Sequence, residues 1–366
     1  MSQTHQSAVQ AVEEALPKTL KSVISIIPDA CYENPTWKGI VYVVFDIILY
    51  GVCMYGLLAT DSPFLLIPLW ILASFSVSAL FILGHDAGHG ALFSSSKMND
   101  TIGRILMLPS LHAYAAWDLG HNRVHHSFTI KEENDFVWHP VCHEEFKKFP
   151  WYKKLMHRIE WSAFGAGVYY IKEIWWKKMF YFTPPSKLAA EISSDKRMVI
   201  YFALFTFISC ALLGTQYAGW TFGYAAWTWV KLIGIPFLMF NYIIGATVHI
   251  HHIQPDIPWH ADGVWNKFKG QVEGTTNFRI SKFFNIFFHN IFIHIPHHVD
   301  PRIPFYNLPA AAESIKRYYQ LAVRDQPFNF RNYFYATRLC KLYDFEKNVW
   351  MNYKGQIVSV PLQVPS

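Results

Sequence analysis

The chain has 366 residues, of which 52% are hydrophobic, 17% aromatic and only 16% charged. Soluble domains carry about 25% charged residues, so this composition argues against a water-soluble protein. The net charge of +6 includes no run of like charges typical of a nucleic-acid-binding tail, and the five scattered cysteines form no Cys-x-x-Cys pair, which excludes a thiolate metal site and a disulfide framework.

Four apolar stretches, taken in chain order, approach the length of a membrane span. They cover residues 39–59, 64–83, 198–213 and 227–248. A hydrocarbon core about 30 Å thick needs roughly 20 helical residues, so the third stretch is short and needs its flanking aromatic residues to cross. The links 60–63 and 214–224 are short. Each pair of stretches therefore predicts a helical hairpin.

The sequence predicts an all-α integral membrane protein, with four transmembrane helices in two hairpins and a helical cytoplasmic cap that carries the functional site. We expect a cytoplasmic N-terminal segment at 1–36, a membrane domain at 37–310 and a cytoplasmic C-terminal segment at 311–366. The two links lack Lys and Arg, whereas the segment between the hairpins, 85–197, is rich in both. The positive-inside rule then places the middle segment and both termini in the cytoplasm.

Two charged residues interrupt the predicted spans. Asp46 lies within the first, and Lys231 lies near the outer end of the fourth. Charged side chains inside a membrane are rare, and they face other helices or reach for the interface. We expect Asp46 to turn toward another helix in a structural role, although a functional role stays open, and we expect Lys231 to extend to the interface.

Eight of the 18 histidines fall into three clusters, which the predicted topology brings to the same cytoplasmic side. The clusters are His85 with His89, His121 with His125 and His126, and His294 with His297 and His298. Side chains four positions apart share a helix face, which predicts that His85 lies beside His89 and His121 beside His125. The third cluster places His294 three and four residues before its pair, and Pro296 predicts that it lies at the start of a helix.

These eight histidines are the predicted metal ligands and catalytic residues. Neutral imidazole is a strong ligand for Fe, Zn, Cu and Ni. Eight imidazoles are more than one tetrahedral zinc can use, and they suit two metal ions that each keep an open position. A single His-x-x-x-His pair is usually a surface or capping feature. Three clusters on one side of a four-span protein favour a metal centre.

A ninth ligand is expected at the end of the fourth span, where His252 follows His249 by three residues. We predict His252 as the ligand, leave the roles of His249 and His251 open, and expect His289 beside the centre at most. The other histidines are interpreted as surface, packing or neighbouring residues, and they are His5, His112, His139, His143, His157 and His260.

The three histidine boxes, in this order and with this separation, resemble the membrane fatty-acid desaturase family over residues 40–307. The resemblance is strongest to the methyl-end, Δ12-like acyl-lipid branch. Its flanking motifs resemble the runs 133–140 (Glu-Asn-Asp-Phe-Val-Trp-His-Pro), 255–258 (Pro-Asp-Ile-Pro) and 302–307 (Arg-Ile-Pro-Phe-Tyr-Asn). Two departures leave the position of the double bond open. Asp118 and Gly120 stand where the branch has basic residues, and box two has three intervening residues where many members have two.

The resemblance implies a di-iron enzyme. Two Fe ions would activate O2, ferredoxin or cytochrome b5 would supply two electrons, and a long fatty-acyl chain, lipid-linked in this branch, would gain a cis double bond. Zinc is redox-inert and cannot support this reaction. We also expect Asp86, Asp135 and Asn290 to orient ligand rings through hydrogen bonds, with helix capping or a solvated charge as the alternative for each. The acyl carrier, the donor and the oligomeric state stay open.

Two other readings share these boxes. A related membrane di-iron hydroxylase, acetylenase or epoxygenase would act on the same acyl chains, and an extra oxygen in the product would identify a hydroxylase or an epoxygenase. A degenerate, non-enzymatic metal-binding homologue would have lost ligands, whereas all eight are present here.

Overall fold

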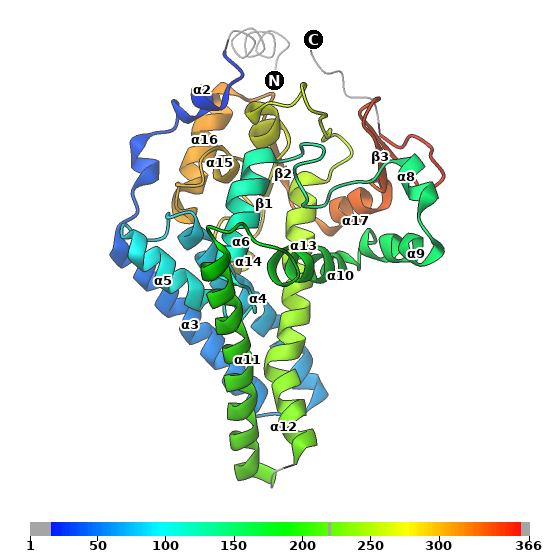
Figure 1. Ribbon diagram of the computed structural model, residues 1–366. Coiled ribbons are helices and arrows are strands. Elements are labelled where there is room, and N and C mark those ends of the chain that lie inside the picture. Colours follow the sequence, from blue (N-terminus) through cyan, green and yellow to red (C-terminus); the bar gives the residue numbers. More distant parts are fainter. Residues whose placement is uncertain (1–15, 219–220, 360–366) are drawn as a thin grey trace.

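The computed structural model describes residues 16–218 and 221–359. A stem of long helices carries a broad cap (Figure 1). Within the described residues, four helical segments are long and apolar enough to cross a membrane, as many as the sequence predicted. They are α3 (Thr36–Leu58), α4 (Pro63–Gly88), α11 (Ala189–Ala218), and the continuous run of α12 (Phe222–Trp229), the π-helical turn η4 (Val230–Gly234) and α13 (Ile235–His252).

The third span is longer than its apolar stretch predicted, because α11 begins at Ala189 rather than near residue 198. Its first turns are polar and lie in the cap. There the Asp195 carboxylate accepts hydrogen bonds from Arg104 Nε at 3.0 Å and from the Ala115 backbone N–H at 2.7 Å. Hydropathy gives no signal for a polar helical extension, so the sequence predicted only the membrane-facing part of this helix.

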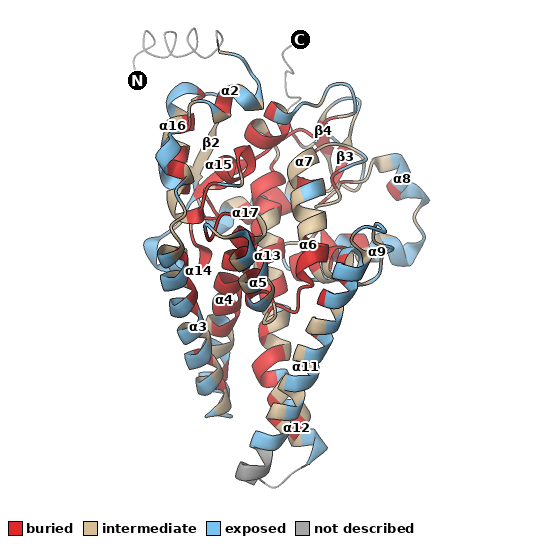
Figure 2. Cartoon of the chain, turned by 60° about the vertical axis from the view of Figure 1, so that its left-hand side comes forward, coloured by how far each residue is buried: buried red, intermediate tan, exposed pale blue. Residues whose placement is uncertain are grey.

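Two of the spans form the centre of the stem and two face outward. In the most apolar 18-residue stretch of each span, the buried share is 56% for α4 and 50% for the α12–α13 run. The corresponding share is only 17% for α3 and 11% for α11. Figure 2 shows the same division, with exposed residues along α3 and α11 and buried ones along α4. Exposed apolar side chains on α3, such as Ile40, Val44 and Ile48, suit contact with lipid.

Glycines let a short cap helix lie directly against the central span. A side-chain carbon on Gly245 of α13 would collide with the Ala166 carbonyl of α10 (Ala166–Tyr169), and one on Gly167 would lie 3.1 Å from Tyr242. Small residues permit such backbone contact between helices. This contact fixes the end of α13, and therefore His252, relative to the cap.

The cap consists of short helices, as predicted, with two small sheets in addition. Between the hairpins it contains α5 (Ser96–Leu106), α6 (Tyr114–Gly120), the π-helical turn η2 (His121–His125), α7 (His126–Phe128), α8 (His143–Lys148), α9 (Trp151–Glu160), α10 and the π-helix η3 (Tyr170–Phe180). After α13 it contains η5 (Lys269–Glu273), α14 (Lys282–Phe288), α15 (His294–Val299), η6 (Phe305–Asn307), α16 (Leu308–Tyr318) and α17 (Phe330–Leu339). The segment before α3 adds α2 (Leu20–Ile24) and η1 (Asp29–Tyr32).

The two sheets have two strands each and tie distant segments to the cap. Strand β1 (Thr276–Arg279) pairs in parallel with β2 (Arg324–Pro327), with Thr276 opposite Arg324. Strand β3 (Leu342–Asp344) pairs antiparallel with β4 (Val349–Met351). Tyr343 and Trp350 from the second sheet are fully buried. The Tyr343 hydroxyl oxygen accepts a hydrogen bond from the backbone N–H of Trp259. The C-terminal residues therefore pack against the loop that follows α13.

Asp46 turns inward from α3, as expected, and its partner is a histidine of the cap. Its Oδ2 lies 2.6 Å from His289 Nε2, and both side chains are buried. His289 ends α14 in a left-handed conformation with φ +42°. The pair thereby joins the first span to the turn that precedes the third histidine cluster.

Replacing Asp46 with alanine should lower the melting temperature of the detergent-solubilised protein. His289 Nε2 would then lose its partner in a buried site, which costs about 1–3 kcal/mol of unfolding free energy. Thermal unfolding followed by circular dichroism would measure this loss. Asp29→Ala is the matched control, because Asp29 is exposed. Equal melting temperatures for Asp46→Ala and the unmodified protein would contradict a structural role for this pair.

Lys231 lies at the far end of the stem from the cap histidines. Its Nζ is 2.8 Å from Asp61 Oδ1 and 3.0 Å from the Thr60 carbonyl, and the Trp70 indole N–H donates to the Lys231 carbonyl at 2.9 Å. The lysine extends toward the end of the membrane span, as expected, but is buried there while Asp61 is exposed. This ion pair ties the two hairpins together.

Candidate metal centre

The histidine clusters come from four parts of the chain that meet where the stem joins the cap. His85 lies in the last turn of α4, and His89 caps that helix. His121 and His125 bound the π-helical turn η2, and His126 begins α7. His252 is the last residue of α13. The third cluster occupies α15, which begins at His294 as Pro296 predicted.

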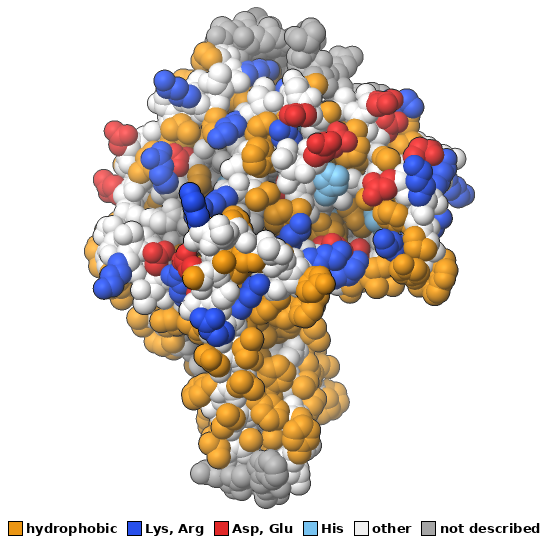
Figure 3. All heavy atoms as spheres, in the orientation of Figure 1, with side chains coloured by type: hydrophobic (Ala, Val, Ile, Leu, Met, Phe, Trp, Pro, Cys, Tyr) orange, Lys and Arg blue, Asp and Glu red, His pale blue; other side chains and the backbone are white. Residues whose placement is uncertain are grey.

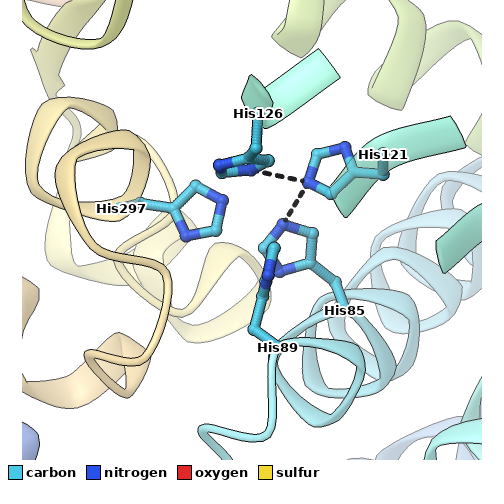
Figure 4. A group of neighbouring side chains, drawn as sticks. All are labelled: His85, His89, His121, His126 and His297. Carbon is cyan, nitrogen blue, oxygen red and sulfur yellow. Dashed lines mark hydrogen bonds between the residues drawn. The ribbon is translucent and has the colours of Figure 1, made fainter. Parts of the chain in front are cut away.

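Five of these histidines form a first group, in which one ring nitrogen from each lies within 4.8 Å of all the others. They are His85, His89, His121, His126 and His297. Their rings point toward a common centre (Figure 4). The Nε2 atom of His121 is 3.0 Å from that of His85 and 3.1 Å from that of His126.

A second group forms deeper in the protein. His125, His252 and His298 each offer a ring nitrogen within the same 4.8 Å limit, and all three are buried. The Nε2 atom of His294 lies 3.1 Å from that of His298, and the ring centroids of His294 and His252 are 5.2 Å apart. The structure therefore brings the eight box histidines and His252 together in two adjacent groups.

Box two divides between the two groups. His121 and His125 lie beside each other as predicted, with ring centroids 5.5 Å apart, but they fall in different groups, and the Nε2 atom of His121 lies 3.1 Å from that of His126. The cause is the π-helical turn, in which the His126 N–H donates to the His121 carbonyl, five residues back. A π turn is wider than an α turn, so a residue five positions on also comes near the same face, and His126 joins His125 beside His121. In the third cluster, His294 contacts both later histidines as their spacing predicted, with its Nε2 3.1 Å from that of His298 and its ring centroid 5.3 Å from that of His297.

In the second group, the Nδ1 atoms of the histidine rings contact hydrogen-bond acceptors. The Nδ1 atoms of His252 and His294 lie 3.0 Å from the Gly274 carbonyl and 3.1 Å from the Ile291 carbonyl. Carbonyl oxygens only accept hydrogen bonds, so these Nδ1 atoms carry the proton. Each Nε2 is then left with its lone pair, the form in which imidazole binds a metal.

Two side chains hold the remaining members of the second group in the same way. The Asp135 carboxylate lies 3.1 Å from His125 Nδ1 and also accepts from the Ile130 and Val137 N–H groups at 3.0 Å each. Gln271 Oε1 lies 2.8 Å from His298 Nδ1. The sequence had singled out Asp135. Gln271 and Gly274 carry no comparable signal, because they lie in a stretch without histidines.

The other expected orienting residues act less directly. Asp86 Oδ1 is 3.4 Å from His85 Nδ1, a long contact, while its Oδ2 accepts from the Phe305 N–H at 2.7 Å. Asn290 contacts Asn285 and the Phe305 carbonyl instead of a ligand ring. His289 pairs with Asp46 and belongs to neither group.

The remaining described histidines lie outside the two groups. His251 stacks on His294 with ring centroids 4.0 Å apart, and His249 packs against Trp138 at 4.6 Å. Five others lie elsewhere in the described cap: His112, His139, His143, His157 and His260. His5 lies outside the described residues.

The protonation and hydrogen bonding of these histidines favour bound metal cations. Burial lowers the pKa of six grouped histidines outside the spans well below the ordinary value, and neighbouring imidazoles lower the pKa of each of them further. These residues are His89, His121, His126, His294, His297 and His298. All are neutral at pH 7. Within the described protein, the Nε2 atoms of His89, His252 and His297 have no hydrogen-bond partner. Buried lone pairs that converge without donors are unfavourable unless a metal ion accepts them.

A narrow pocket of about 80 Å³ reaches both groups. Its polar wall includes His85, His121, His125 and His294, and its apolar wall includes Phe81, Trp117, Ile174, Met179 and Ile244. The Trp117 ring stacks on His121 with centroids 4.6 Å apart and closes one side. An apolar, elongated substrate suits this lining better than a polar one.

Comparison with known proteins agrees with this site. The profile of the family described as fatty acid desaturase matches residues 61–330. The chloroplastic omega-6 fatty acid desaturase of Glycine max is 28% identical over 90% of this chain and 75% of its own length. The sn-1 oleoyl-lipid 12-desaturase of Anabaena variabilis is 27% identical over 88% of this chain and 89% of its own. The sn-1 acyl-lipid omega-3 desaturase (ferredoxin) of a Synechocystis species is 30% identical over 83% of this chain and 82% of its own length. The chain therefore belongs to the fatty acid desaturase family, whose members are oxidoreductases of lipid metabolism.

Proposed function

We propose that this protein is an O2-dependent acyl-lipid desaturase that inserts a cis double bond, with Δ12-like regiochemistry, into a long acyl chain. The observation that carries the proposal is the meeting of two groups of histidine imidazoles beside a narrow apolar pocket. Relatives named as sn-1 oleoyl-lipid 12-desaturases support the acyl-lipid substrate and the regiochemistry. A relative named as ferredoxin-dependent supports ferredoxin over cytochrome b5 as the donor.

Nine histidines would hold two iron ions. His85, His89, His121, His126 and His297 would bind the first, and His125, His252, His294 and His298 the second. Two redox-active ions would supply, with O2, the oxidising power to remove hydrogen from an unactivated methylene pair, which no side-chain acid or base can do. Within each box, the spacing of three to five residues would keep the ligand histidines close together in space.

The protein's own residues would position the chain and keep water away. Asp135 and Gln271 hold His125 and His298 by Nδ1, so those rings keep a fixed tautomer and direction. Trp117, Phe81 and Met179 line the pocket and would exclude water from the acyl chain. Charge asymmetry between the links and the cap further supports a cytoplasmic cap and cytoplasmic termini, with residues 37–310 as the membrane catalytic domain.

Gas chromatography with mass spectrometry of total fatty acids tests this function. Expression with a ferredoxin and its reductase, in a host that makes oleoyl lipids, should produce a new diunsaturated acid, and derivatisation should place the second double bond at the Δ12 carbon. The same host carrying a variant without one ligand histidine is the control. A hydroxylated product, or the same new acid in the control, would overturn the proposal.

A further inference from the structure

A second, polar cavity adjoins the apolar pocket. It is a groove of about 1060 Å³ whose walls come from α8, α9, η3 and the loop that follows box two. Phe136 and Lys178 line both cavities, and Lys178 Nζ lies 4.8 Å above the Phe136 ring. Gly120 also lines both and leaves Phe136 room, since a side-chain carbon there would lie 3.1 Å from that ring. The groove and the pocket thus meet at the Phe136–Lys178 pair.

Helix α9 places this groove at the membrane surface. Its residues Trp151, Leu155 and Ile159 are exposed and lie on one face, while His157 and Glu160 line the groove. A helix with an exposed apolar face and a polar face lies in the interface of a membrane. Figure 3 shows apolar side chains along the underside of the overhanging part of the cap, with charged side chains above them.

The charges of the groove nearly cancel. Apart from the buried Asp135, its described lining has four carboxylates, Glu133, Glu145, Glu160 and Glu173, and four lysines, Lys153, Lys172, Lys177 and Lys178. Lys172 pairs with Glu160 and Glu173, and Lys177 with Glu173. Among the described lining residues there is no arginine. A multiply anionic carrier would therefore meet no surplus of positive charge.

One histidine of the groove wall is almost completely buried. His157 is 7% exposed, its Nδ1 lies 3.1 Å from the Tyr353 hydroxyl, and its Nε2 has no partner among the described residues. Burial and nearby lysines lower the His157 pKa to about 4, so the ring is neutral at pH 7. A neutral imidazole in the wall adds no positive charge to the groove.

We propose that this groove binds the head group of a membrane glycerolipid with no net charge, whose acyl chain passes Phe136 and Lys178 to reach the histidines. The inference rests on the proposed function, since it adds the substrate's polar half to the same site. Carrier choice then follows from charge. A galactosyl or phosphocholine head group is accepted, and a phosphatidylglycerol or coenzyme A carrier is disfavoured.

Neighbouring glutamates of α8 provide a matched test. Both Glu144 and Glu145 are exposed, but only Glu145 lines the groove, while Glu144 pairs with Lys147 at 2.8 Å. The probes are dioleoyl lipids with galactosyl, phosphocholine or phosphoglycerol head groups, and oleoyl-coenzyme A. Native mass spectrometry of the detergent-solubilised protein measures binding, and product analysis in lipid nanodiscs measures turnover.

The unmodified protein should prefer the two net-neutral lipids over both anionic carriers. Glu145→Lys should shift the ratio of anionic to neutral binding upward about fivefold at low salt, the effect of reversing one charge at ~8 Å in watery surroundings. Glu144→Lys should shift the ratio by a smaller factor, because its charge lies outside the groove. Unchanged melting temperatures in both variants would show that the difference is not one of folding.

Several outcomes would overturn the inference. They are a preference for oleoyl-coenzyme A, equal ratios in the two variants, or displacement of bound lipid by ferredoxin, which would make the groove a donor-docking surface. Neutral-lipid binding that depends on Glu145, without desaturation of any carrier, would support the groove while contradicting the proposed function.

Discussion

Replacing His125 with alanine is expected to abolish desaturation and lower the bound iron while leaving the helices intact. His125 forms the second group with His252 and His298, and all three side chains are buried. Loss of its nitrogen leaves the second group one ligand short, which should reduce turnover by more than the factor of about 100 seen when residues behind a ligand are changed. Fatty-acid analysis measures turnover, and elemental analysis of purified protein measures iron.

His260→Ala is the matched control for this experiment. His260 is buried, and its pKa is lowered by burial to about 4, so it is also a neutral buried imidazole, but it belongs to neither group. This variant should keep its iron and its activity. Full activity in His125→Ala would remove the basis for a two-iron site, and loss of iron in His260→Ala would show that the assay reports general destabilisation.

Asp135→Asn is expected to reduce turnover by about 10–100-fold, the usual effect of losing the partner behind a ligating histidine. The carboxylate accepts from His125 Nδ1 and from two backbone N–H groups. An amide offers only one accepting oxygen and points an N–H₂ group at one of these donors. The variant should also lose about 1–3 kcal/mol of unfolding free energy. Steady-state kinetics should show a larger fall in kcat than change in KM, because Asp135 does not line the apolar pocket and contributes only a buried side chain to the wall of the polar groove.

Asp262→Asn serves as the comparison, since the Asp262 side chain is 82% exposed and pairs with Lys131 at the surface. It should behave like the unmodified protein. Asp135→Glu should recover part of the activity, because it restores an acceptor of the correct charge. If Asp135→Asn kept normal kcat and an unaltered iron spectrum, the carboxylate would serve only to hold the loop at Ile130 and Val137.

The sequence predicted those features of the fold that depend on local pattern. Apolar stretches gave the four spans, and the position of Pro296 gave the start of α15. The two small sheets were missed, since β1 joins residues 276–279 to 324–327, a pairing set by tertiary contacts rather than by alternation within either strand. The polar first turns of α11 were missed because hydropathy reports only the part of a helix that faces lipid.

The candidate site was predictable in its members but not in its grouping. All eight box histidines and His252 come together, because each lies at the cap end of a span or in a short cap helix. Their division into two groups depends on backbone geometry that spacing alone does not reveal. Gln271 and Gly274 were also missed, since they contact His298 and His252 only through the path of the chain.

The π-helical turn at box two changes how its departure from the family pattern should be interpreted. The pattern that this box resembles has two residues between its first two histidines, whereas this chain places three, from Asn122 to Val124. The wide turn takes up the additional residue, so that His126 still returns to His121. Separation along the chain and separation in space are therefore uncoupled here. An insertion within a ligand motif can be silent at the metal when the helix widens by one residue to absorb it.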